Sequence, residues 1–320
     1  MQADASNPAP SPATAPPPAK RQVALLLEAS SAYARGILRG VARFSNLHER
    51  WQFVGHPRHA APSLESLACD GIIGQWGQGV EPPAGVPAVL VSNARPPAGA
   101  PRVHADDRAA GRLAAEHLLA RGFHRFAFVS AGDLCYMQER AQGFVRQIAS
   151  AGYHCSTCDL AAWHQESYRA QQQHLRDWIA ALPKPIGLLA CRDVTGWRVM
   201  EAAREAAVAV PGALAVLGVD DDDLLCERTD PPMSSVALPA EKIGYEAAAL
   251  PQRLMNQEPA PCEPLLIPPL GITVRRSTDV LAVTDPNVGM ALNFIRSRVA
   301  QGLAVRDVFD AVPVSRRVLE

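Results

Sequence analysis

The chain has 320 residues, of which 48% are hydrophobic and 20% are charged, and its formal net charge is −1. This composition allows a large buried core and excludes a chain that is disordered throughout. The near-zero charge excludes a body that binds nucleic acid over its whole surface, so any DNA contact must be local. The length suits two domains and a smaller additional piece.

The first 19 residues are rich in alanine, proline and serine and contain no basic residue. They lack the apolar stretch of a secretory signal peptide, so we predict that residues 1–20 form a disordered tail. No apolar run approaches the length of a bilayer span, so we expect no membrane contact. Seven cysteines at irregular spacing are not typical of a disulfide framework and favour a reduced, cytoplasmic protein.

From Arg21 onward, short apolar runs alternate with amphipathic stretches. The expected strands are 22–27, 51–55, 71–74, 87–92, 125–130, 153–159, 186–190, 213–219, 234–237, 265–267 and 271–276. The expected helices are 33–45, 105–119, 139–151, 167–181, 196–206 and 243–255. This alternation predicts parallel sheets with helices on both faces. Because the strands are too many for one sheet, we predict an α/β fold of two doubly wound lobes over residues 21–279, with a ligand cleft at the carboxyl ends of the strands.

Residues 280–320 have a different pattern, which predicts a linker and a small all-α unit. Helices are expected at 289–301 and 305–311, followed by a tight turn and by Ser315 as the N-cap of a further helix. This outline is typical of a helix-turn-helix DNA reader, in which Arg316 and Arg317 would contact phosphates or base edges. The alternative is a plain helix start with two exposed arginines.

An ordered set of segments resembles the sugar-responsive repressors of the LacI type, whose sensor has the two lobes of a type I periplasmic binding protein. The segments are 103–118, 121–125, 210–221, 231–236, 243–248 and 275–279. Residues 305–320 instead resemble the first helix-turn-helix of the AraC type. A LacI-type sensor followed by an AraC-type reader is the arrangement of the xylose operon regulator family, which segments 25–35 and 276–286 also resemble. Members of that family carry two such reader units, so we expect this chain to hold a truncated reader.

The resemblance implies that a small effector, a monosaccharide such as a pentose, binds between the lobes. Sugar sites pair charged or amide side chains with hydroxyl groups and place an aromatic ring against the apolar face of the sugar. By their positions in the family's motifs, and for the last three by their places near strand ends, the expected ligand-binding residues are Arg140, Asp220, Asp193, Arg192, Trp76, Tyr33 and Asn93.

These candidates also have structural alternatives. Arg140 could pair with a neighbouring carboxylate, Asp193 could cap the helix that follows it, and Trp76 could be a packed loop tryptophan. Asp220 begins a run of four aspartates, of which only the first is placed by the end of a strand. The segment around Trp76 contains glutamine and glycine, whereas relatives that bind xylose carry acidic residues there.

The acidic run 220–223 and the pair Cys155 and Cys158 could each indicate a metal or redox site. Four consecutive carboxylates point in alternating directions and make a poor cation site, and no second cysteine pair accompanies the first. We therefore predict free thiols, no metal and no cofactor. No nucleophile elbow, phosphate loop or paired Cys–His site stands out, so we predict that the protein is not an enzyme.

Two classes of function remain compatible with the sequence. The first is a ligand-responsive, DNA-binding transcription regulator of carbohydrate metabolism genes that acts as a homodimer on operator DNA. The second is a solute-binding protein, or a sensor module without its own DNA binding, which would have the same two-lobed cleft. The predicted reader segment and the expected lack of an export signal favour the first.

Overall fold

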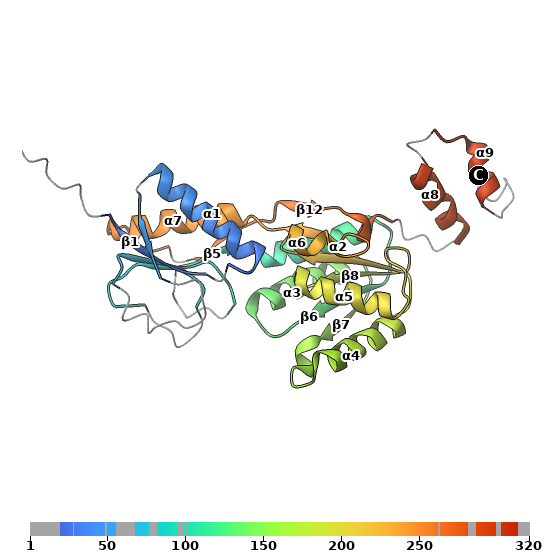
Figure 1. Ribbon diagram of the computed structural model, residues 1–320, viewed down its shortest axis with the longest axis horizontal. Helices are drawn as coiled ribbons and strands as arrows, with labels where there is room; N and C mark the ends of the chain where they lie inside the picture. The colour runs from blue at the N-terminus through green and yellow to red at the C-terminus, as the bar shows by residue number, and fades with distance from the viewer. Residues whose placement is uncertain are drawn as a thin grey trace, which may run out of the picture.

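The computed structural model describes residues 20–27, 29–48, 50–55, 68–76, 82–94, 99, 101–261, 263–280, 286–298 and 302–312. Two α/β lobes follow one another along the long axis, and a pair of helices lies beyond the second lobe (Figure 1). The predicted two-lobed α/β fold is therefore confirmed. No helix in the described ranges is long and apolar enough to cross a bilayer.

The first lobe is built on a parallel sheet with the strand order β2-β1-β3-β4. Its strands are β1 (Gln22–Leu26), β2 (Gln52–Val54), β3 (Gly71–Gly74) and β4 (Ala88–Leu90). A second parallel pair, β5 (Val103–Ala105) and β11 (Leu265–Ile267), is connected to β4 by a bridge between Leu90 and Arg102. Helix α1 (Ala32–Leu47) packs against helix α7 (Ala240–Met255), so a late segment of the chain completes this lobe.

The second lobe contains a six-stranded sheet with the order β12-β10-β9-β8-β6-β7, in which only β10 and β12 are antiparallel neighbours. The strands are β6 (Phe126–Ser130), β7 (Cys155–Asp159), β8 (Ile186–Ala190), β9 (Leu214–Val219), β10 (Ser234–Ala237) and β12 (Gly271–Thr273). The helices are α2 (Asp107–Leu119), α3 (Cys135–Ser150), α4 (Tyr168–Ala181), α5 (Asp193–Glu205) and α6 (Asp223–Cys226), with 3-10 turns at Leu160–Trp163 and Arg276–Thr278.

The central strands of this sheet are apolar along their whole length because helices cover both faces. One core cluster includes Phe126 and Phe144, and it continues into the first lobe through Ile37. The other cluster, on the opposite face, includes Leu175 and Val199 from α4 and α5. The cysteines at 155 and 158 lie on β7 at the sheet edge, and both thiols are free.

The C-terminal pair consists of α8 (Pro286–Arg298) and α9 (Val305–Ala311). Helix α8 begins three residues before the predicted start, and proline is favoured at a first helical position. Asp307 accepts a hydrogen bond from the amide of Ala304 at 2.9 Å and so caps the start of α9. Ser315, Arg316 and Arg317, the predicted DNA-contacting residues, lie outside the described residues.

The prediction was wrong at three helix starts that matter for the site. Helix α3 begins at Cys135 rather than at residue 139, and α5 begins at Asp193 rather than at residue 196. The helix expected from residue 105 begins at Asp107, and residues 103–105 form the strand β5 instead. The side chain of Asp106 caps this helix by accepting from the amide of Ala109 at 2.8 Å. The strand partner of β5 lies about 160 residues later in the chain, so a local pattern of three residues carries no signal for it.

Helices α2 and α3 approach so closely that glycine is required at their contact. A β-carbon at Gly111 would meet the carbonyl oxygen of Arg140, and one at Gly143 would meet that of Arg108. We therefore expect Gly111→Ala and Gly143→Ala each to lower the free energy of unfolding by about 1–3 kcal/mol, measured by urea unfolding, because the helices must separate. Gly212→Ala is the control, since its β-carbon would meet nothing within 4 Å. Equal effects at the three positions would contradict this explanation.

Candidate ligand-binding site

A cavity of about 260 Å³ lies between the two lobes. The first lobe contributes Tyr33, Gln75, Ser92 and Asn93, and the second contributes Asp107, Tyr136, Arg140, Arg192 and Asp220. Most of these residues follow the carboxyl end of a strand, which is where ligands bind in parallel sheets. Five of the seven predicted residues therefore share one cavity, and Trp76 and Asp193 are not in its lining.

Arg140 is the central charged group of the cavity. Its Nε donates to Oδ1 of Asp107 at 2.8 Å, and its Nη1 donates to the carbonyl oxygen of Cys191 at 2.6 Å. Its Nη2 lies 3.5 Å from Oδ1 of Asp220, and its guanidinium carbon lies 5.0 Å from the ring centre of Tyr136. One buried guanidinium thus ties together the start of α2 and the ends of β8 and β9. The charge-assisted contacts offset its loss of hydration.

The two carboxyl groups that face Arg140 have pKa values close to neutral pH. Burial raises the pKa of Asp107 to about 6 and that of Asp220 to about 6, although Arg140 opposes both rises. A carboxylate accepts hydrogen bonds, whereas a protonated carboxyl group can also donate one. Two such groups on one cavity wall can therefore bind a hydroxyl group whether it donates or accepts the hydrogen bond.

The first lobe contributes Tyr33 from the first turn of α1 and Asn93 from the segment after β4. The hydroxyl of Tyr33 donates to the carbonyl of Val91 at 3.0 Å, and burial raises its pKa, so it stays protonated. The amide nitrogen of Asn93 donates to Glu139 at 2.8 Å, and its oxygen accepts from Arg102 at 3.3 Å. These bonds hold the carboxamide in place while leaving one N–H for a ligand.

His104 joins the cavity from strand β5 and was not predicted. Its Nδ1 lies 2.9 Å from the carbonyl oxygen of Ala105. Because a carbonyl can only accept, Nδ1 carries the proton and Nε2 is an acceptor. Burial lowers the pKa of His104, which keeps the ring neutral. Asp107 was also missed as a site residue, although its place at the start of a helix after a strand was a usable signal.

Arg192 is the N-cap residue of α5 and lies directly after the segment that ends β8. Among the described residues its guanidinium has no hydrogen-bond or ion-pair partner, and its Nε is buried without an acceptor. Leaving such a group unpaired is unfavourable, so a ligand acceptor would be stabilised there. The indole nitrogen of Trp76, after β3, is likewise buried without a partner in the described part of the chain. Its contact with a ligand stays a prediction.

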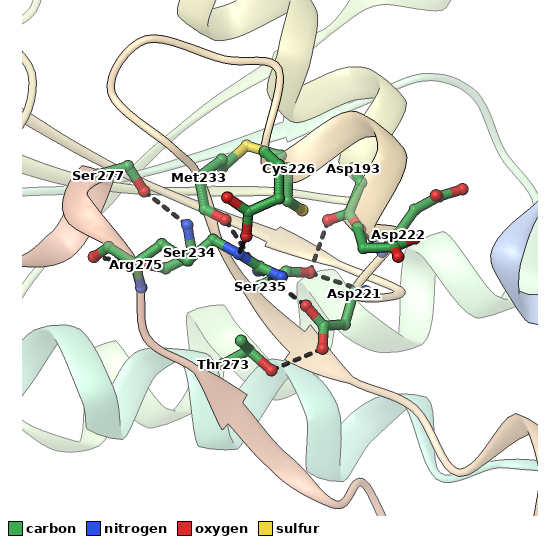
Figure 2. Close-up of polar contacts among 12 residues, drawn as sticks. Asp193, Asp221, Asp222, Cys226, Met233, Ser234, Ser235, Thr273, Arg275 and Ser277 are labelled. Carbon is green, nitrogen blue, oxygen red and sulfur yellow. Dashed lines mark hydrogen bonds and ion pairs between the residues drawn. The ribbon is translucent and has the colours of Figure 1, made fainter.

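The helix-cap alternative for Asp193 is not the one observed, because helix α5 begins at Asp193 itself, with Arg192 at the N-cap. The carboxylate instead accepts from the hydroxyl of Ser235 at 2.6 Å and from the amide of Asp222 at 2.7 Å (Figure 2). Asp193 is 1% exposed, and its hydrogen bond with the amide of Asp222 helps to hold the acidic run in place. The contact of Asp193 with a ligand stays a prediction.

The acidic run is held in an unusual backbone conformation. Asp220 and Asp221 have φ angles of 116° and 51°, which side chains rarely adopt. Asp221 accepts from Thr273 at 2.6 Å and from Arg275 at 2.8 Å, and its amide donates to Ser235 (Figure 2). These contacts hold the strained turn, and Asp220 lies in the lining of the cavity. In the described ranges, no group of three or more His, Cys, Asp or Glu side chains is arranged to hold a metal ion.

Asp222 provides a direct link between the lobes. One of its carboxylate oxygens accepts from the amide of Ala32, at the start of α1, at 3.2 Å. Both oxygens accept from Nη2 of Arg35 at 3.3 Å. The positive end of the α1 dipole adds to this attraction. Asp222 is therefore a latch that joins the second lobe to the first beside the ligand cavity.

The burial of Asp193 leads to a pH-dependent prediction. Burial, and the nearby Asp220, raise the pKa of Asp193 from 3.8 to about 8. The folded protein therefore keeps a proton that the unfolded chain releases, so the stability contributed by this group falls as pH rises from about 4 to about 8. Asp193→Asn removes this titration. The free energy of unfolding of the variant minus that of the unsubstituted protein is therefore expected to be larger at pH 8 than at pH 5, by about 1 kcal/mol or more.

Urea unfolding of both proteins at pH 5 and pH 8 measures this difference. The amide cannot accept both hydrogen bonds, but that loss shifts the variant by an amount that does not depend on pH. A constant difference between the two proteins would show that Asp193 is ionised throughout.

Comparison with known proteins agrees with this geometry. Residues 115–278 match the family model of the periplasmic binding protein-like domain. Over 315 residues the chain is 30% identical to the xylose operon regulatory protein of Escherichia coli (strain K12), covering 94% of this chain and 80% of that protein. The chain belongs to the xylose operon regulator family. The resemblance seen in the sequence is therefore confirmed.

Solved structures support the same assignment. The structure of the xylose-binding transcription activator xylR matches this chain with a TM-score of 0.73 and 28% sequence identity. The match covers 95% of this chain and 81% of the xylR chain. The transcriptional regulator CelR–cellobiose complex has a TM-score of 0.66 and 25% identity and covers 81% of this chain and 86% of its own. These relatives are transcription regulators rather than enzymes.

Proposed function

We propose that this member of the xylose operon regulator family is a monosaccharide-responsive transcription regulator of carbohydrate metabolism genes. The observation that carries the proposal is the cavity between the lobes, where Arg192, Asp220 and His104 present unused donors and acceptors to one small volume. Its volume of about 260 Å³ suits one monosaccharide rather than a larger ligand. A related regulator whose structure is named as xylose-binding supports a monosaccharide, and another named as a complex with cellobiose, a disaccharide, supports a sugar effector in general.

The chemistry of the lining fits a polyhydroxylated molecule. A sugar hydroxyl can donate to the carboxylate of Asp220 and accept from the guanidinium of Arg192 at the same time. Tyr136 adds an aromatic ring to the same wall and could cover the apolar face of the sugar. Since the lining also includes Tyr33 and Asn93 of the first lobe, a bound sugar would favour the closed arrangement that the Asp222 latch also stabilises.

Closure of the two lobes is the step that would transmit sugar binding to the DNA reader. A ligand that prefers the closed lobes by a few kcal/mol is sufficient to shift the population of the two arrangements. We infer that the protein acts in the cytoplasm as a homodimer, with an AraC-type reader that begins with α8 and α9 and continues to Arg316 and Arg317. Paired readers would then contact paired half-sites of an operator.

A thermal-shift screen of the full chain against pentoses, hexoses and their acids and alcohols tests the sensor function. A sugar that binds the folded state raises the melting temperature as its concentration increases. Asp220→Ala is expected to abolish the shift, whereas Asp223→Ala, an exposed neighbour, is expected to retain it. No shift with any sugar, and no heat of binding by calorimetry, would refute the sensor function.

Selection of bound fragments from a genomic DNA library tests the DNA-binding function. Recovery of the same sites in repeated rounds, with enrichment that changes when the sugar is added, is expected for a regulator. A chain that binds sugar but enriches no fragment would instead be a sensor module or solute-binding protein without its own DNA binding.

A further inference from the structure

The charges around the ligand cavity do not pair evenly. Four charged groups line it, namely Asp107, Arg140, Arg192 and Asp220. Arg140 bonds to Asp107 at 2.8 Å and also lies 3.5 Å from Asp220, so one guanidinium faces both carboxyl groups. Arg192 is left with no carboxylate within ion-pair distance among the described residues. The acidic and basic groups of the lining are therefore equal in number, but both carboxyl groups face Arg140, while Arg192 acts on Asp220 only over a longer distance by lowering its pKa.

The structure gives Arg192 little freedom to leave the cavity or to lose its charge. It is the N-cap residue of α5, directly after Cys191, which is buried and whose carbonyl is bound by Arg140. Its Nε is shielded from solvent and has no acceptor among the residues that the structure describes, while the residue as a whole is half-buried. A guanidinium stays protonated in proteins, so the charge cannot be removed by titration.

The best partner for such a group is a carboxylate. A neutral hydroxyl accepts a hydrogen bond from a guanidinium but leaves its charge uncompensated. A carboxylate accepts two parallel N–H bonds and neutralises the charge at the same time. Resting on the proposed function, we infer that the effector is a sugar carboxylate, an aldonate or a uronate, and that Arg192 is the residue that selects it over the neutral sugar.

The remaining groups of the cavity favour a carboxylate over a phosphate ester. Asp107 and Asp220 lie on the same wall, and a doubly charged phosphate would be repelled by both. A singly charged carboxylate at Arg192 leaves Asp220, His104 and Asn93 for the hydroxyl groups of the sugar. The small cavity also limits the effector to one sugar unit.

Calorimetric titration of the full chain at pH 7.5 tests this inference with probes that share a carbon skeleton. The probes are galactose, galactonate, galacturonate and galactose 6-phosphate, with the corresponding sets built on glucose and xylose. At least one acid is expected to bind at least about 10-fold more tightly than its neutral parent, as expected for hydrogen bonds to a charged group. Arg192→Gln is expected to weaken that acid by about 10- to 100-fold. The neutral sugar also loses a hydrogen bond to the guanidinium, but no charge is neutralised, so its affinity is expected to fall by a clearly smaller factor than that of the acid.

Two further variants show whether the effect is specific. Arg204→Gln, at an exposed position of the same helix, is expected to bind all probes like the unsubstituted protein. Arg192→Lys keeps the charge but not the planar fork, so it is expected to retain the preference for the acid with lower affinity. It also tests the inference if the glutamine variant does not fold.

The outcomes separate this inference from the proposed function. A neutral sugar or a phosphate ester that binds as tightly as every acid would overturn the inference and leave the sensor function intact. The same holds if Arg192→Gln weakens the acid and the neutral sugar equally. No saturable binding by any probe would overturn both.

Discussion

Replacing Arg140 by alanine is expected to abolish effector binding and to lower the free energy of unfolding by about 3–5 kcal/mol. The guanidinium is buried and is the ion-pair partner of Asp107 and Asp220. Its removal leaves two carboxyl groups facing each other across a vacated volume, and it also frees the carbonyl of Cys191. The polar lining of the cavity would lose its central support along with one of its donors.

The measurements are urea unfolding at pH 7.5 and calorimetric titration with whichever sugar shifts the melting temperature of the unsubstituted protein. Arg146→Ala is the matched control, because Arg146 lies on the same helix and is exposed. We expect it to change stability by less than about 0.5 kcal/mol and to leave binding unchanged. A variant at position 140 that is as stable as this control would show that the ion pairs contribute little to the fold.

Asp222→Ala is expected to weaken effector binding by about 10- to 100-fold without removing any residue from the cavity lining. The carboxylate bonds to the amide of Ala32 and to Arg35, both on the opposite lobe. Hydrogen bonds to charged groups each contribute about 1.5–3 kcal/mol. These contacts join the lobes in this structure, so losing them is expected to lower the population of this arrangement, and the apparent affinity then falls in proportion.

Small-angle X-ray scattering distinguishes this explanation from local damage. The variant without sugar is expected to have a larger radius of gyration than the unsubstituted protein, and saturating sugar is expected to restore the smaller value. Asp223→Ala, at the exposed neighbouring aspartate, is expected to behave like the unsubstituted protein in both measurements. Weaker binding with an unchanged scattering profile would mean that Asp222 acts on the cavity rather than on closure.

The latch also explains why the acidic run is built as it is. Asp220 lies in the cavity lining, Asp221 is bound by Arg275 and Thr273, and Asp222 contacts the other lobe. Consecutive residues with positive φ angles at 220 and 221 direct these side chains to different partners. A change at Asp220, the cavity end of this turn, therefore lies only two positions from Asp222, whose contacts hold the lobes together, which is a short path from ligand to closure.

The sequence by itself determined the repeated strand-and-helix order and the two-lobed fold, because buried parallel strands are short apolar runs and amphipathic helices repeat every three to four residues. It also indicated Arg140, Asp220 and Arg192 by resemblance, and local position was sufficient to bring Tyr33 and Asn93 to strand ends. Signals of this kind are local, so one chain without a structure reveals them.

Only the tertiary structure decided which charges pair. Strand β5, and with it His104, depends on a partner strand about 160 residues away, and no local pattern encodes that pairing. The hydrogen bonds of Asp193 with Ser235 and Asp222 and the latch from Asp222 to α1 join residues distant in the chain. Hydrogen bonds and ion pairs act over a few ångströms, so the role of a polar side chain follows from its neighbours in space rather than from its place in the sequence.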